Sequence, residues 1–183
     1  LRYGIGPHRL PRNILDLELA WIERLGVTFV LGRNIDFKKD LPGLAKEHDA
    51  VLVTAGTWAD RKLDAPGENL EGVEGCLDFL PRLYRGEIKR LKEKIAVIGD
   101  GNAAFDLARA LVRVGAEVTI VSWFDADSIP ADPAEYAGAL AEGVKLHPGA
   151  RVIAFEGEKG RLRRLVCRPT QPGPADDRGI CWP

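Results

Sequence analysis

The sequence predicts an α/β protein in which helices pack on a doubly wound parallel sheet, with an antiparallel hairpin added to it. Short apolar runs without polar alternation, typical of strands buried on both faces of a parallel sheet, alternate with segments of helical periodicity. From residue 94 to residue 121, a strand, a glycine turn, a helix and a second strand follow one another. This order indicates a β-α-β unit, in which both strands run parallel.

The first 75 residues show less of this pattern. Apolar residues at helical spacing predict a helix over Asn13–Arg24, and a shorter helix is expected around Leu41–Glu47. Val27–Leu31 is β-branched and aromatic, and Ala50–Thr54 is continuously apolar, so both are predicted strands. Residues 57–75 are rich in Gly, Pro, Asp and Glu, which indicates a connection between two domains.

The remaining residues predict one continuous α/β arrangement. Asp132 is expected to cap a helix that has Pro133 at its first position. A polar turn at residues 156–160 separates two apolar runs and predicts a hairpin. In chain order the predicted elements are a helix from Leu77 onward, strand Lys94–Ile98, helix Asn102–Val114, strand Glu117–Val121, helix Pro133–Leu140, strand Val144–His147, and hairpin strands Ala150–Phe155 and Leu162–Cys167.

The composition is that of a globular protein: of 183 residues, 45% are apolar and 29% are charged, and the net charge is −1. This balance argues against binding to nucleic acid or to an anionic membrane surface. No window approaches the roughly 20 consecutive apolar residues of a spanning helix, and no basic-then-apolar leader is found, so a cytoplasmic location is expected. The chain has no methionine and opens on Leu1, which indicates a piece of a longer protein.

The cysteines and histidines predict neither a metal site nor a redox dithiol. Cys76, Cys167 and Cys181 are far apart and form no C-x-x-C pair. The three histidines lack metal-ligand spacing. We therefore expect isolated thiols, no metal ligand and no catalytic acid or base among these side chains.

The motif that carries chemistry lies between a predicted strand and a predicted helix and reads Gly99-Asp100-Gly101-Asn102-Ala103-Ala104. In a Rossmann-like fold this pattern binds the pyrophosphate of a dinucleotide. Gly99 allows the tight turn, Gly101 has no Cβ to block the phosphates, and Ala104 lets the helix approach the strand. The helix N-terminus adds free N–H groups and the positive end of its dipole. All six residues are candidate cofactor contacts, and the alternative is a glycine turn that binds nothing.

The end of the second strand predicts which nucleotide is bound, because the adenosine ribose is read there, about 20 residues past the glycines. Ser122, Trp123 and Asp125 are the candidate contacts, with Trp123 placed to stack on adenine. An NADP site needs Arg or Lys for the 2′-phosphate, yet no basic residue lies between Arg113 and Lys145. A dianionic phosphate would meet like charge in this acidic stretch, whereas a ribose hydroxyl can donate to Ser122, Asp125 or Asp127. The sequence thus favours NAD over NADP.

Four segments match the motifs of one family in order. Leu1–Pro11 is similar to L-R-Y-G-I-P-x-x-R-L-P, and Val53–Trp58 is similar to A-T-G-T-W. Leu63–Asn69 resembles L-x-x-P-G-E-(D/N), and Gly99–Asp106 resembles G-x-G-N-x-A-x-D. These motifs are those of the glutamate synthase small-subunit family of FAD- and pyridine nucleotide-dependent oxidoreductases, which the chain resembles over nearly its whole length.

The resemblance implies two nested Rossmann-like domains, with an NAD(P)H domain inserted into an FAD domain. Residues 1–75 are then a partial FAD-binding domain with its linker, and residues 76–183 are the NAD(P)-binding domain, truncated at its C-terminus. The family's FAD fingerprint, cysteine-rich iron–sulfur segment and closing G-D are absent, so FAD is expected only in the full-length protein. Ala55, Gly56 and Thr57 stand in the A-T-G-T-W match and are expected to contact a cofactor.

The resemblance also implies a function. In the family, hydride passes from NAD(P)H to FAD and then to an iron–sulfur partner, so the chain is expected to be the nucleotide-binding part of such an enzyme, with an iron–sulfur or amidotransferase protein as partner and without activity alone. Where the family has Tyr-Arg-Arg for the 2′-phosphate, this sequence has Ser122-Trp123-Phe124. The alternative is a non-catalytic nucleotide-binding or scaffold module with a degenerate site.

Three charged residues lie in or near these motifs and are not assigned to catalysis. Asp106 is expected in the first turn of its helix, where a carboxylate complements the helix dipole. Arg9 and Arg61 match family positions, and both structural pairing and cofactor contact are open for them.

Overall fold

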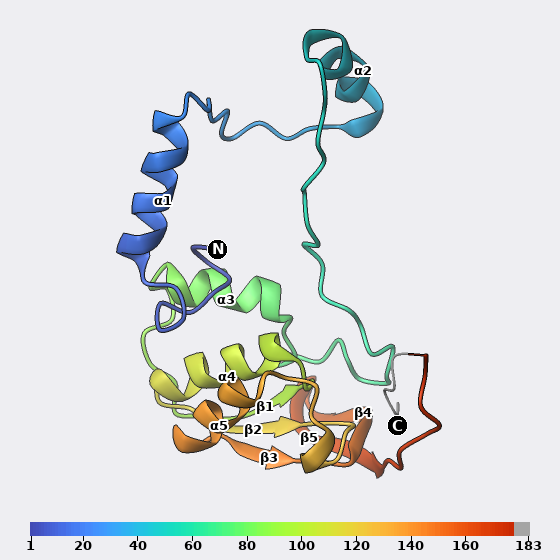
Figure 1. Cartoon of the computed structure of the whole chain (residues 1–183). Coiled ribbons are helices and arrows are strands. Elements are labelled where there is room, and N and C mark those ends of the chain that lie inside the picture. Colours follow the sequence, from blue (N-terminus) through green and yellow to red (C-terminus); the bar gives the residue numbers. More distant parts are fainter. Residues whose placement is uncertain (178–183) are drawn as a thin grey trace.

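The computed structural model describes residues 1–177. Figure 1 shows an extended N-terminal part, with α1 (Arg12–Arg24) and α2 (Phe37–Glu47), above a compact α/β part. The compact part consists, in chain order, of α3 (Cys76–Tyr84), β1 (Lys94–Ile98), α4 (Asn102–Arg113), β2 (Glu117–Val121), the short 3-10 helix η1 (Ala126–Ser128), α5 (Pro133–Ala141), β3 (Lys145–His147), β4 (Ala150–Glu158) and β5 (Arg161–Pro169).

The parallel sheet has the strand order β1-β2-β3. Lys94–Ile98 pairs with Glu117–Val121 residue by residue, and Thr119–Val121 pairs with Lys145–His147. The helix α4 connects β1 to β2, and α5 connects β2 to β3. The predicted α/β fold with a parallel sheet and an antiparallel hairpin is therefore confirmed, although the hairpin, β4–β5, forms a sheet of its own rather than extending the parallel sheet.

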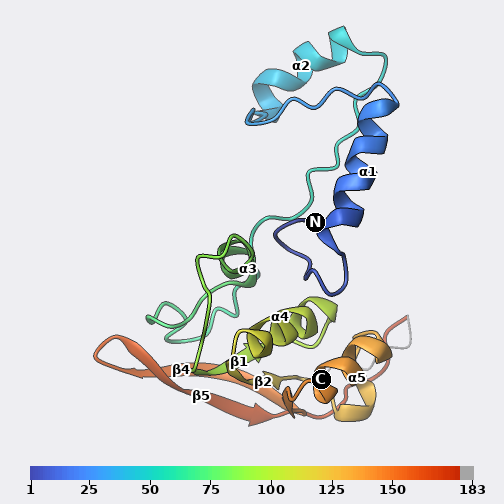
Figure 2. The ribbon, with the colours of Figure 1, turned by 90° about the vertical axis from the view of Figure 1, so that its left-hand side faces the viewer.

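The two faces of the sheet are covered by different elements, because successive strand residues point to opposite sides. Val97 and Ile120 point to the side of α4, where they pack with the fully buried Phe105. Val121 points to the other side and packs with Phe155 of the hairpin. Figure 2 shows α4 and α3 on one side of the sheet and the hairpin on the other.

The linker that precedes α3 packs against the hairpin at a glycine. Gly67 has φ +80°, and a Cβ at this position would lie 2.0 Å from the carbonyl oxygen of Phe155. The neighbouring Pro66 carbonyl accepts a hydrogen bond of 2.8 Å from the Phe155 N–H. Only glycine allows this close approach of the two backbones. The linker therefore packs directly against β4 at this position.

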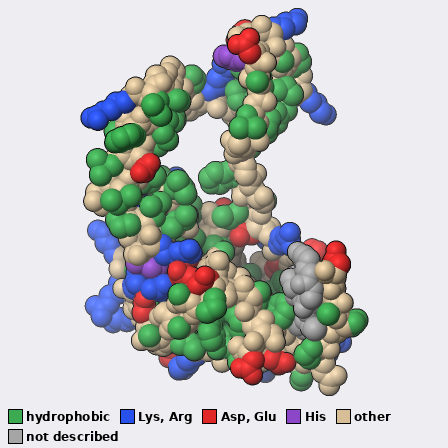
Figure 3. All heavy atoms as spheres, viewed as in Figure 1, with side chains coloured by type: hydrophobic (Ala, Val, Ile, Leu, Met, Phe, Trp, Pro, Cys, Tyr) green, Lys and Arg blue, Asp and Glu red, His purple; other side chains and the backbone are tan. Residues whose placement is uncertain are grey.

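Two predicted strands in the N-terminal part are not strands in the structure. Val27–Leu31 and Ala50–Thr54 are extended but belong to no sheet among the described residues. Leu31 and Leu52 are 85% and 88% exposed. Figure 3 shows many apolar side chains on the surface of this part. The prediction was wrong because a β-branched run becomes a strand only where a neighbouring strand accepts its hydrogen bonds, and the described residues provide none there.

The start of α2 also differs from the prediction. The helix begins at Phe37 rather than near Leu41, because Asp36 caps it by accepting a hydrogen bond of 2.9 Å from the Lys38 N–H. The cap of α5 is as predicted, since Asp132 accepts from the Ala134 N–H at 2.8 Å. Cys181 lies outside the described residues.

An ion pair joins the N-terminal segment to α4. Asp106 lies in the second turn of α4, whose first turn contains no acidic residue, so the expected dipole role for Asp106 was wrong. Its carboxylate is 8% exposed and accepts a hydrogen bond of 2.8 Å from Arg9 Nη1. Arg9 also lies 3.3 Å from Glu135 on α5. Figure 3 shows charged side chains of both signs crowded together below α1. Of the two interpretations of Arg9, the structure supports structural pairing.

Replacing Arg9 by alanine is expected to lower the free energy of unfolding by about 1–2 kcal/mol, because the nearly buried Asp106 carboxylate loses its charged partner. Urea denaturation measures this loss, and hydrogen exchange is expected to speed up in residues 1–24. Arg33→Ala is the matched control, since Arg33 is 56% exposed and only 3.9 Å from Asp40, an arrangement of little energetic value. Equal stabilities of the two variants would contradict the assigned role of Arg9.

Candidate nucleotide-binding site

The conformation of the turn between β1 and α4 depends on a hydrogen bond and a backbone dihedral angle of Gly99. Its N–H continues the sheet by donating to the Val121 carbonyl at 3.1 Å, and its φ is +138°. That backbone conformation is one that residues with a Cβ rarely adopt. A Cβ on Gly99 would also lie 3.5 Å from the Cβ of Ala104, so the helix packs closely on the turn. The expected roles of Gly99 and Ala104 in turn and packing agree with this geometry.

The N-terminus of α4 is open to an incoming group. Gly101 is the N-cap residue, and no side chain caps this helix end. No heavy atom lies within 4 Å of the place where a Cβ of Gly101 would be. The first N–H groups of a helix have no partner within the helix, and they carry the positive end of its dipole. A phosphate can therefore reach the amides that follow Gly101.

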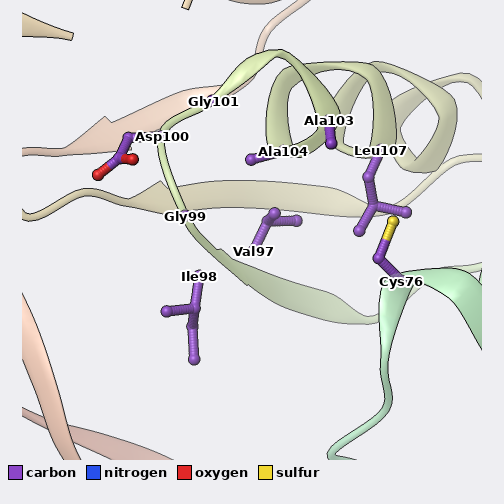
Figure 4. A pocket seen from close by; sticks show the side chains of 9 residues that line it. All are labelled: Cys76, Val97, Ile98, Gly99, Asp100, Gly101, Ala103, Ala104 and Leu107. Carbon is purple, nitrogen blue, oxygen red and sulfur yellow. The ribbon is translucent and has the colours of Figure 1, made fainter. Parts of the chain in front are cut away.

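A cavity of about 290 Å³ lies beside this turn. Figure 4 shows its lining, which joins residues 97–101 and the first turns of α4 to Cys76 at the start of α3. Burial raises the pKa of the Cys76 thiol to about 11, so this thiol stays protonated near neutral pH. Cys76 therefore contributes a neutral thiol to the wall of the cavity.

The end of β2 is held rigidly beside the turn. Ser122 is fully buried, and its backbone is fixed by hydrogen bonds from its N–H to His147 and from the Ala150 N–H to its carbonyl. Its hydroxyl lies 3.2 Å from Asp100 Oδ2, and the Trp123 N–H lies 3.3 Å from the same oxygen. The structure thus brings Asp100 together with Ser122 and Trp123, which the sequence placed separately at the two ends of the site.

Two residues of the site come from the hairpin and were missed by sequence reasoning. The guanidinium carbon of Arg151, on β4, lies 5.3 Å from the ring centroid of Trp123. The hydroxyl of Thr170, just after β5, donates to the Trp123 carbonyl at 2.6 Å. The sequence window between Arg113 and Lys145 lacks basic residues, but the fold brings Arg151 beside that window. The expectation that no basic side chain lies at this end of the site was therefore wrong. No local pattern marks Arg151, because hairpin pairing alone decides where it lies.

Of the other candidate residues, some lie at the cavity beside the glycine turn and others lie away from it. Asn102 uses its side-chain oxygen to accept from the Asp132 N–H at 2.7 Å, which ties α4 to the loop before α5. Ala103 lines the cavity, and Asp125 is exposed beyond the end of β2. Ala55, Gly56 and Thr57 lie in the exposed, extended segment after α2 and do not line the cavity. Figure 1 shows the chain running down from α2 toward the compact part, so the segment just after α2 lies above the sheet and apart from it.

Arg61 lies elsewhere, at a second cavity of about 810 Å³ between the linker, β1 and the hairpin. Within residues 1–177, no group of three or more His, Cys, Asp or Glu side chains is placed to hold a metal ion. In the same residues, none of the helices combines the length and the apolar character needed to cross a membrane.

A parallel β-α-β unit with a glycine turn and an open helix N-terminus defines a dinucleotide-binding type of fold. Residues 20–171 match the family model described as "Pyridine nucleotide-disulphide oxidoreductase", and the chain belongs to this family. The NAD-dependent dihydropyrimidine dehydrogenase subunit PreT of Escherichia coli O157:H7 is 37% identical over 90% of the chain. The glutamate synthase [NADPH] small chain of Halomonas elongata is 30% identical over 98% of the chain. The resemblance to the glutamate synthase small-subunit family is thus confirmed.

A solved structure supports the fold. The whole chain superposes on 56% of Mycobacterium tuberculosis FprA, solved in complex with NADPH, with a TM-score of 0.68 at 19% identity. The chain spans 40% of the length of each of the two curated relatives. One of them is named for NAD and the other for NADPH, so family membership supports a pyridine nucleotide without deciding between the two.

Proposed function

We propose that this chain binds a pyridine nucleotide at the turn Gly99–Ala104 and serves as the nucleotide-binding part of a longer FAD-dependent oxidoreductase. The observation that carries the proposal is the open N-terminus of α4, where Gly101 leaves free space for a pyrophosphate beside a turn that requires glycine at position 99. Membership of the pyridine nucleotide-disulphide oxidoreductase family supports it.

The residues fit the two ends of a dinucleotide. The backbone of Gly99, Gly101 and Ala103 receives the pyrophosphate, and Trp123 offers its ring to the adenine. NAD(P)H supplies a hydride and FAD accepts it, while the protein orients the nicotinamide and keeps the path short. Hence no side chain of this chain is assigned as a catalytic acid or base.

The proposal divides the chain into two parts of a longer protein. Residues 76–183 form the nucleotide-binding domain in this proposal, and residues 1–75 are the linker and a partial FAD-binding domain. Exposed apolar residues in Val27–Leu31 and Ala50–Thr54 are consistent with a sheet completed by other parts of the protein. The segment Ala55–Thr57 contacts a cofactor only in that complete protein, and FAD binding belongs there as well.

NADH is the favoured nucleotide, and the electrons go on to an iron–sulfur or amidotransferase partner. Acidic side chains at the site, Asp100 and Asp125, oppose a dianionic 2′-phosphate. Two relatives are named as a subunit and as a small chain, which supports a partner protein. NADPH is the second candidate, because Arg151 lies at the same end of the site.

The test is a titration of the purified chain with NADH and with NADPH, followed by tryptophan fluorescence. We expect saturable binding of NADH, tighter than that of NADPH, and no flavin absorbance in the chain alone. Binding of neither nucleotide would contradict the proposal and favour a scaffold module with a degenerate site. Tighter NADPH binding would reverse only the choice of nucleotide.

A further inference from the structure

The residues directly after β2 do not include the acidic side chain that a dinucleotide-binding fold usually has there. In dinucleotide-binding folds, the acidic residue that binds the adenosine ribose follows the second strand, about 20 residues after the glycines. Here that place is taken by Ser122 and Trp123, and neither is acidic. The nearest acidic residue along the chain, Asp125, is exposed and lies beyond the strand end.

Asp100, the residue between the two glycines, brings its carboxylate to this place. Its Oδ2 lies 3.2 Å from the Ser122 hydroxyl and 3.3 Å from the Trp123 N–H. The parallel register of Ile98 with Val121 explains the contact, because it sets the first residues after β1 beside the first residues after β2. Figure 4 shows the Asp100 side chain pointing away from the apolar side chains of Ala103, Leu107 and Cys76.

The surroundings leave this carboxylate able to meet a ligand. Asp100 is half-buried, and both of its hydrogen bonds among the described residues involve Oδ2. Oδ1 therefore remains an acceptor for a ribose hydroxyl. Ser122 is fully buried and hydrogen-bonded through its N–H, carbonyl and hydroxyl, so the group that holds Asp100 Oδ2 has a defined place at the end of β2.

We propose that Asp100 determines the nucleotide specificity of this site, by accepting a hydrogen bond from the adenosine ribose of NADH and repelling the 2′-phosphate of NADPH. This inference rests on the proposed nucleotide binding. The glycine turn then has two tasks: its backbone receives the pyrophosphate, and its one acidic side chain reads the ribose.

The positive charge of Arg151 opposes the effect of Asp100, because it attracts the 2′-phosphate of NADPH. Its guanidinium is exposed and reaches the Trp123 ring, whereas Asp100 bonds directly to the two residues at the end of β2. Solvent screens an exposed charge more strongly than a half-buried one. Asp100 therefore outweighs Arg151, although Arg151 lowers the discrimination against NADPH.

The test compares the dissociation constants of NADH and NADPH for the full chain and three variants. Asp100→Asn keeps an acceptor oxygen for Ser122 and Trp123 but removes the charge. We expect it to move the NADPH-to-NADH affinity ratio toward NADPH by about tenfold or more, a change that the loss of one nearby charge repulsion can produce. Arg151→Gln is expected to move the ratio in the opposite direction, toward NADH.

Asp78→Asn is the matched control, because it removes the same charge from an exposed position in the first turn of α3. We expect its ratio to equal that of the unsubstituted chain, and circular dichroism checks that each variant is folded. An unchanged ratio in Asp100→Asn, or an equal shift in Asp78→Asn, would overturn the role of Asp100 while nucleotide binding stands. Binding of neither nucleotide by the chain and by Asp100→Asn would overturn both proposals.

Discussion

Replacing Gly101 by valine is expected to weaken nucleotide binding about 100-fold or more while the fold stays intact. Gly101 has φ −86° and ψ 173°, which valine adopts without strain, and no protein atom lies within 4 Å of its Cβ position. The new side chain therefore meets nothing in the protein and fills the space that a pyrophosphate needs. Fluorescence titration with NADH measures the affinity, and thermal unfolding checks the fold.

Gly4→Val is the matched control for this variant. Gly4 also has free space around its Cβ position and no positive φ, but it lies far along the chain from the turn. Its affinity for NADH should equal that of the unsubstituted chain. Full NADH affinity in Gly101→Val would show that the pyrophosphate does not approach the N-terminus of α4.

Replacing Phe105 by alanine is expected to lower the free energy of unfolding by about 3–5 kcal/mol. Phe105 is 0% exposed and meets the Tyr136 ring edge to face, with centroids 5.6 Å apart and an interplanar angle of 84°. It lies in the core between α4 and the sheet, so the substitution leaves a cavity that close-packed neighbours fill only in part. A loss of this size is a large share of the stability of a typical domain.

Urea denaturation measures the free energy of unfolding of Phe105→Ala and of a control variant, Leu52→Ala. Leu52 is 88% exposed, so its truncation is expected to change the free energy of unfolding by less than about 0.5 kcal/mol. If both variants lost the same stability, the apolar run Ala50–Thr54 would be packed in the chain as tightly as the core. Such a result would contradict the exposed, extended conformation of that segment.

Local sequence patterns were sufficient for the compact part. The strands around Val97 and Ile120 were predicted at the bounds they have, because short apolar runs that adjoin a glycine turn have few other solutions in a parallel sheet. The turn at Gly99 and the cap at Asp132 were also predictable, since both depend on residues close in the chain. The same kind of pattern failed at Val27–Leu31, where strand formation depends on a partner strand that no local signal describes.

The charges of the site depended on the fold rather than on the chain order. A search of the sequence near Trp123 finds no basic residue, yet Arg151 reaches its ring from the hairpin. Asp106 looked like a residue for the helix dipole, but Arg9, 97 positions away in the chain, binds its carboxylate.

The stretch between Arg113 and Lys145 does lack lysine and arginine, but this stretch alone does not determine the charge at the end of β2. By itself, the sequence determined the order of strands and helices in the compact part, the glycine turn and the family, because these depend on contiguous residues and their periodicity. Only the tertiary structure decided which charged side chains reach the end of β2, namely Asp100 beside Ser122 and Trp123, and Arg151 over the Trp123 ring. The physical reason is that strand register and hairpin pairing, which act between distant residues, set the distances on which electrostatic forces depend.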